Sequence, residues 1–127
     1  MAEAPSGVRK YAAWGLVGLL FAVFALSSLV KLLGVEAMVA NFETYGLSDM
    51  RIVIGIGEFV SAVLFLVPYT SSLGVLLLSA HMGGAIVMHM SHGELYIVQS
   101  VVLILVWVAQ YLRYPELFVS FRRDKDS

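Results

Sequence analysis

The stretch RIVIGIGEFVSAVLFLVP, residues 51–68, decides the fold, because it is an apolar run long enough for a membrane helix and contains a single acid, Glu58. An ionisable side chain near the middle of a bilayer span costs from about 2.5 to more than 10 kcal/mol, so it normally faces a protein partner or water instead of lipid. We therefore expect Glu58 to point into the interior of a helical membrane protein.

The composition agrees with a membrane location. The chain has 127 residues, of which 60% are hydrophobic and only 13% charged, whereas a soluble domain has roughly 25% charged residues. No basic run of the kind that nucleic acid needs is present. Because there is no cysteine, the sequence excludes disulfides, thiol redox chemistry and Cys-based metal sites. Any redox role would therefore depend on a bound cofactor.

Apolar segments of about 20 residues predict four membrane spans. They cover residues 11–33, 51–67, 72–90 and 95–114, with residues 1–10 and 115–127 as terminal segments outside the membrane domain 11–114. The turns around Pro68 and Gly93 are short, so the helices that they join should be antiparallel neighbours. We thus expect an all-α, four-helix antiparallel membrane bundle.

The link between the first two spans is long and has a helical pattern. Its apolar residues fall at i, i+3, i+4 and i+7 and its polar residues lie opposite: Val35, Met38, Val39 and Phe42 against Glu36, Asn41 and Glu43. This pattern predicts a short amphipathic helix on the membrane surface.

The first span could be mistaken for a secretory signal, since Arg9 and Lys10 precede it. We favour a true span, because the apolar run continues past residue 27. More basic residues lie on the side of the termini than on the other: Arg9, Lys10, Arg113, Arg122, Arg123 and Lys125 against Lys31 and Arg51. The positive-inside rule then places both termini in the cytoplasm, in a bacterial inner (plasma) membrane.

Polar residues on each of the four helices predict a site within the bundle. Glu58 and His81 lie at similar distances from the turn at residues 68–72, so they should reach similar depth on neighbouring helices. Lys31, His89 and Gln99 lie at mid-depth or in the outer half. These five residues form the predicted polar pocket.

Each of these residues also has a structural interpretation. Glu58 with Lys31 or His81 could be an ion pair that only fixes helix register, and Lys31 could extend its amine to the membrane surface. His89 and His92 have an i, i+3 spacing that suits a metal, but a third ligand would have to be Glu94 or Glu36, so we predict no metal site.

In combination, these motifs resemble the DoxX-like family of small four-span membrane proteins. The resemblance extends from Trp14 to Tyr114 and rests on ALSSLVKL at residues 25–32, Gly57-Glu58, LVP at residues 66–68, and HMGGAI at residues 81–86 followed by His89. It implies a four-helix bundle and, in some members, association with quinone-linked thiosulfate oxidation or with membrane oxidoreductase assemblies.

The function that we expect is that of an accessory or anchoring subunit of a membrane oxidoreductase or respiratory assembly, in contact with quinone or lipid but without a resident cofactor. Its partners would be lipids and other membrane subunits or a second copy of the chain, held by small residues such as Ser61 and Gly84. One alternative is a small membrane enzyme for a quinone- or isoprenoid-like substrate, with Glu58 and His81 as an acid/base pair. Another is a proton pathway along Glu58, His81 and Gln99.

Overall fold

The computed structural model describes residues 7–121, and this part of the chain is helical, without a strand. Five α-helices follow in order: α1 (Gly7–Leu32), α2 (Glu36–Thr44), α3 (Arg51–Leu66), α4 (Ser71–Ser91) and α5 (Ile97–Arg113). Short 3₁₀ helices precede α3, join α3 to α4, and follow α5: η1 (Ser48–Met50), η2 (Pro68–Thr70) and η3 (Pro115–Phe121). The four long helices expected from the sequence are present with small shifts at their ends, and the short helix expected in the long link is α2.

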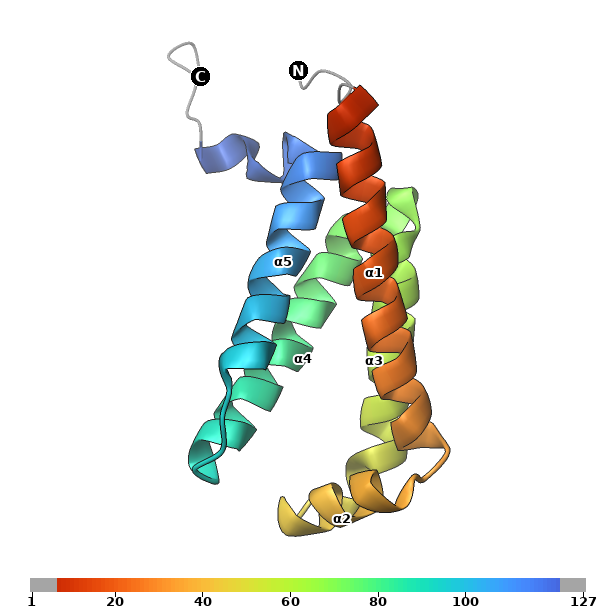
Figure 1. Ribbon diagram of the computed structural model, residues 1–127, viewed down its shortest axis with the longest axis vertical. Coiled ribbons are helices and arrows are strands. Elements are labelled where there is room, and N and C mark those ends of the chain that lie inside the picture. Colours follow the sequence, from red (N-terminus) through yellow and green to blue (C-terminus); the bar gives the residue numbers. More distant parts are fainter. Residues whose placement is uncertain (1–6, 122–127) are drawn as a thin grey trace.

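The four long helices form a ring in which α1 packs on α3 and α5, and α4 packs on the same two helices. Figure 1 shows that the start of α1 and the end of α5 lie at one end of the molecule, whereas α2 lies across the other end. The pair α1 and α3 meets the pair α4 and α5 near the first end, and the two pairs spread apart toward α2. Residues of all four long helices line a cavity.

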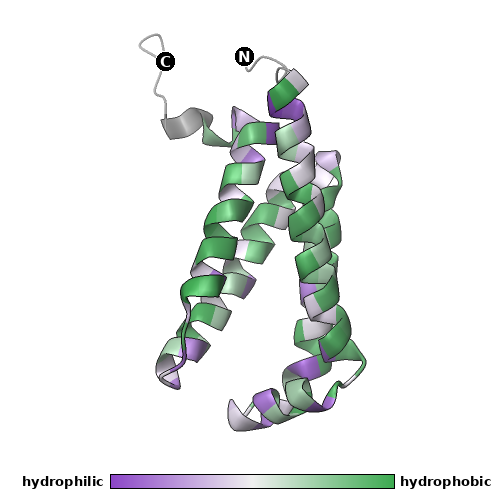
Figure 2. Cartoon of the chain, in the orientation of Figure 1, coloured by the Kyte–Doolittle hydropathy of each residue, from purple (hydrophilic) through white to green (hydrophobic). Residues whose placement is uncertain are grey.

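The outside of the helices is apolar. Figure 2 shows hydrophobic residues along the length of the long helices, with hydrophilic residues gathered near α2 and near the start of α1. Two segments, Gly7–Leu32 and Pro68–Ser91, are long and apolar enough to cross a membrane, judged by length and composition. Helices α3 and α5, with 16 and 17 residues, are shorter than the roughly 20 residues of a typical span. The four-span arrangement therefore stays a prediction.

The helices pack most closely where glycine removes a side chain. A Cβ on Gly74 would lie 2.2 Å from the backbone nitrogen of Phe65, so α3 and α4 touch backbone to backbone there. A Cβ on Gly55 would lie 3.0 Å from Cδ2 of Leu32, which brings α3 close to α1. The buried core includes Phe24, Phe65 and Leu78. The α3–α4 contact at Gly74 lies toward the end opposite α2, whereas the α1–α3 contact at Gly55 lies near α2 and keeps α1 and α3 together there.

Arginine side chains bind the carboxyl-terminal ends of neighbouring helices. Arg113 donates to the carbonyl of Leu66 at the end of α3, at 3.0 Å, and Arg51 donates to a carbonyl in the last turn of α1. Arg9 donates to the carbonyl of Leu112 in the last turn of α5, at 3.1 Å. A cation here satisfies carbonyls that have no partner within the helix and complements the helix dipole. These contacts join α5 to α3, α3 to α1, and α1 to α5.

The same contacts bear on the orientation of the chain. Two of the basic residues counted on the side of the termini, Arg9 and Arg113, bind helix ends, and Arg122, Arg123 and Lys125 lie outside the described residues. The cytoplasmic location of both termini accordingly remains a prediction.

Candidate functional site

The centre of the site is a buried ion cluster. Glu58 shares the inward face of α3 with Gly55, Ser61, Ala62 and Phe65, and only 2% of the residue is exposed. Its Oε1 lies 2.8 Å from Nζ of Lys31 on α1. A carboxylate in this environment requires a partner because burial of an isolated charge is very costly. Glu58 points toward the interior because it lies on the same face of α3 as these small and apolar residues.

The second oxygen of Glu58 faces α4. Nε2 of His81 lies 3.3 Å from Oε2, so the carboxylate contacts one partner on each neighbouring helix. Lys31 also donates to the hydroxyl of Ser27, one turn earlier on α1, at 2.7 Å. One interpretation of the sequence had Lys31 extending to the membrane surface. The structure instead places Lys31 in the interior, with 8% of the residue exposed.

A cavity of about 570 Å³ opens beside this cluster. Its wall combines side chains from α1, α2, the segment before α3, and α3 to α5: Val23, Phe24, Ser27, Lys31, Met38, Asn41, Phe42, Tyr45, Leu47, Ile54, Glu58, Ala80, His81, Met82, Gly84, Ala85, Met88, His89, Val98, Gln99 and Val102. The volume is within the range of pockets that hold small organic molecules, and such pockets combine an apolar wall with a few polar groups. The predicted polar residues Lys31, Glu58, His81, His89 and Gln99 all lie on this one cavity.

Helix α2 closes part of the cavity, and this differs from the face predicted for it. Met38, Asn41, Phe42 and Tyr45 line the cavity, whereas Val39, expected on the apolar face, is 37% exposed. The cavity face is displaced around the helix because Tyr45 contacts α4 and its following turn. Tyr45 is a site residue that the sequence prediction missed, although its i+7 spacing from Met38 could have indicated it.

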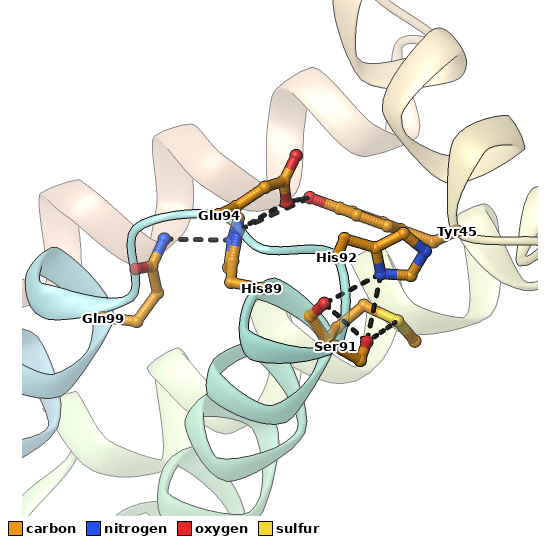
Figure 3. A network of polar contacts seen from close by, with 7 residues as sticks. Tyr45, His89, Ser91, His92, Glu94 and Gln99 are labelled. Carbon is orange, nitrogen blue, oxygen red and sulfur yellow. Dashed lines mark hydrogen bonds and ion pairs between the residues drawn. The ribbon is translucent and has the colours of Figure 1, made fainter.

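A second polar cluster joins α2, α4 and α5 at the wider end of the molecule (Figure 3). The hydroxyl of Tyr45 donates to Oε1 of Glu94 at 2.6 Å, and Nδ1 of His89 lies 2.9 Å from the same oxygen. Nε2 of His89 lies 3.1 Å from the amide nitrogen of Gln99. These bonds link the end of α2 to α4 and its following turn, and α4 to α5, at the wider end of the cavity.

The bonds shift the acidity of two groups at the mouth. Burial, together with the hydrogen bond to Glu94, raises the pKa of Tyr45 from 10.0 to about 12. The bond from Tyr45, and then that from His89, lowers the pKa of Glu94 below its ordinary value. Both shifts favour a neutral phenol bound to an ionised carboxylate.

The structure separates His92 from the other two histidines. His92 does not line the cavity; it lies exposed after the end of α4, where its ring contacts Tyr45 at a centroid distance of 4.9 Å. In the described part of the chain, no group of three or more His, Asp or Glu side chains is placed to hold a metal ion.

The two small residues expected to receive partner helices differ in exposure, since Ser61 is buried and Gly84 is exposed. Ser61 is buried, with 6% exposed, and donates to the carbonyl of Gly57. Gly84 lies in the cavity wall, and a Cβ there would meet open space. The expectation that these two residues hold a partner subunit stays a prediction, and Gly84 also lies in the wall of the cavity.

Comparison with known proteins gives one match. A family model described as the DoxX-like family matches residues 15–109, which cover all four long helices except their outermost turns at the two ends. No curated protein and no solved structure gives a significant match.

Proposed function

The chain belongs to the DoxX-like family, and from this premise we propose that it is a four-span membrane protein whose cavity binds an apolar molecule with a polar head, a quinone or a lipid. We place it as an accessory or anchoring subunit of a membrane oxidoreductase or respiratory assembly. The observation that carries the proposal is the apolar cavity of about 570 Å³ with the cluster of Lys31, Glu58 and His81 in its wall. An apolar ligand would reach such a cavity from the bilayer.

Support for the membrane arrangement comes from the outer surface. Large apolar side chains are exposed on each of the four long helices, among them Leu19, Ile56, Leu76 and Ile104. In water this would be an extensive apolar surface of the kind that soluble monomers avoid, whereas lipid or a partner helix covers it without cost. The proposal locates the protein in a bacterial inner membrane with both termini in the cytoplasm.

Support for a subunit role comes from what lies outside the helices. The connections within the described residues are short, and apart from α2 they contain only turns and 3₁₀ helices. The sequence has no nucleotide-binding loop or haem-attachment motif. A partner protein would accordingly supply any electron-transfer group.

The binding proposal predicts that the purified protein retains a lipid-like molecule. The protein would be purified in mild detergent and its bound molecules identified by native mass spectrometry. The variant Gly84→Leu fills the cavity and should reduce ligand occupancy at least tenfold. Gly83→Leu is the matched control, because Gly83 is not in the cavity wall and a Cβ there meets open space.

Equal occupancy in the two variants would contradict binding in this cavity. For the subunit role, purification of the unaltered chain should recover redox subunits in a fixed ratio. Recovery of the chain alone or as a homo-oligomer, in repeated preparations from native membranes, would refute that part of the proposal.

A second candidate function is catalysis on the bound molecule. It is favoured by the contact of 3.3 Å between Nε2 of His81 and Glu58, because a histidine between a carboxylate and a cavity can accept a proton from a substrate. The variant Glu58→Gln retains the shape of the side chain but cannot stabilise a protonated imidazole. A substrate-dependent activity of the purified chain, lost in Glu58→Gln at unchanged thermal stability, would establish the enzyme and exclude a purely accessory role.

A further inference from the structure

We propose that the cavity selects a neutral head group with a hydrogen-bond donor, namely the hydroxyl of a phenol, a quinol or a long-chain alcohol, and that this hydroxyl donates to Nδ1 of His81. The inference rests on the proposed function, in that it requires the cavity to bind an apolar molecule. It adds the chemical class of the head group and the atom that recognises it.

The cation of the site has no free donor for an anionic head. The ammonium of Lys31 has three N–H groups, and three acceptors lie around it: Oε1 of Glu58 at 2.8 Å, the hydroxyl of Ser27 at 2.7 Å and the carbonyl of Ser27 at 3.4 Å. A phosphate or carboxylate head would compete with Glu58 for this amine, and the negative charge of Glu58 would repel it. The cluster thus disfavours anionic lipids and free anions.

The contacts of His81 assign its tautomer. An ionised carboxylate only accepts hydrogen bonds, so Nε2, at 3.3 Å from Oε2 of Glu58, carries the proton. Lys31 already balances the charge of Glu58 at 2.8 Å, and a second cation would leave an uncompensated charge in an apolar cavity. A neutral imidazole with Nε2 protonated has a lone pair on Nδ1.

That lone pair is available to a ligand. Within the described residues, Nδ1 of His81 has no hydrogen-bond partner, and the ring, 19% exposed, lies in the cavity wall. The mouth shows the same polarity: the amide nitrogen of Gln99 is bound to His89, and its carbonyl oxygen is buried without a partner in this part of the chain. Since the accessible Nδ1 of His81 is an acceptor, a donor on the ligand is the complementary group.

The remaining wall suits the body of such a molecule. Val23, Phe24, Ile54, Met82 and Val102 supply apolar surface around the polar cluster. A ring or an alkyl chain attached to the hydroxyl would lie against these side chains, where contact with apolar surface stabilises it.

Three probes with one tail and different heads test the inference: para-nonylphenol, its methyl ether and its phosphate ester. Dissociation constants would be measured by calorimetry with the full chain in mild detergent. We expect the phenol to bind about five- to tenfold more tightly than the ether, the difference made by one hydrogen bond, and the phosphate to bind more weakly than the ether. In His81→Phe the ratio of phenol to ether should fall to about one. The control His92→Phe replaces a histidine that lies just after the same helix and outside the cavity, and it should retain the ratio.

The outcomes separate the two proposals. Equal binding of phenol and ether, or tightest binding of the phosphate, overturns the inference but leaves ligand binding in place. Failure of all three probes to bind overturns both. If His81→Phe does not fold, nitrogen NMR of the unaltered protein provides the test, because the Nδ1 signal of His81 should move with the phenol and not with the ether. No movement of that signal while the phenol is bound would contradict the assigned atom.

Discussion

Replacement of Glu58 by alanine should strongly destabilise the protein. The residue is 2% exposed and has charged or hydrogen-bonding partners at 2.8 and 3.3 Å. A hydrogen bond to a charged group contributes about 1.5–3 kcal/mol, and removal of one member of a buried ion pair typically costs about 3–5 kcal/mol. We therefore expect Glu58→Ala to lower the free energy of unfolding by about 3–5 kcal/mol, because it leaves the amine of Lys31 buried without its counter-ion.

A double variant distinguishes the stranded charge from lost packing. If the stranded charge is the cause, adding Lys31→Met to Glu58→Ala should recover most of the stability, since no charge is then left unpaired. The coupling between the two positions follows from a double-mutant cycle. A sum of the single effects equal to the double effect would show that the two side chains act independently.

The assay is denaturant unfolding in mild detergent, followed by circular dichroism. The control Glu94→Ala removes a carboxylate that is 44% exposed in its side chain, so it should lower the free energy of unfolding far less than Glu58→Ala does. A loss of less than about 1 kcal/mol in Glu58→Ala would refute the reasoning, because it would mean that water already solvates the pair.

Three further predictions concern packing, ionisation and topology. Gly74→Ala should lower the free energy of unfolding by about 3 kcal/mol or more, since its Cβ would lie 2.2 Å from a backbone atom of α3. In Gly57→Ala the Cβ meets open space, so that variant should be neutral or stabilising by up to about 1 kcal/mol. Equal melting temperatures of the two variants would contradict this. In an ultraviolet titration, Tyr45 should ionise with a pKa of about 12. Its contribution to stability is therefore present below pH 10.0 and lost as the pH rises through about 12. A titration curve that is unchanged in Tyr45→Phe would exclude the assignment of this pKa to Tyr45. A reporter fused after Ser127 should be cytoplasmic and a tag beside Gly93 external, and a periplasmic reporter would reverse the topology.

Much of the fold was predictable because helix formation depends on local sequence. Apolar runs, the break at Pro68 and the turn around Gly93 located the four long helices, and the i, i+3, i+4 pattern located α2. The resemblance to the DoxX-like family, drawn from short motifs, is confirmed by the family match over residues 15–109.

The sequence by itself determined that a charge had to be paired. An acid in an apolar helix is too costly to leave alone, so Glu58 required a cation or a donor, and counting residues along the helices brought Lys31 and His81 within consideration. Which oxygen faces which partner depends on how α1, α3 and α4 pack, and that packing is set by close contacts at Gly55 and Gly74.

Only the tertiary structure decided the shape of the site. The helix pairs pack closely at one end and spread apart at the other, so the polar residues of the four helices surround a cavity. Gly84 lies in the wall of this cavity, although the sequence around Gly84 suggested a contact with another helix. Tyr45 reaches the site because α2 lies across the wider end of the molecule. The hydroxyl of Tyr45 donates a hydrogen bond there to Glu94, which lies in a turn far away in the sequence. Such contacts join residues far apart in the chain, so no local pattern specifies them: they arise from the angles at which the helices pack.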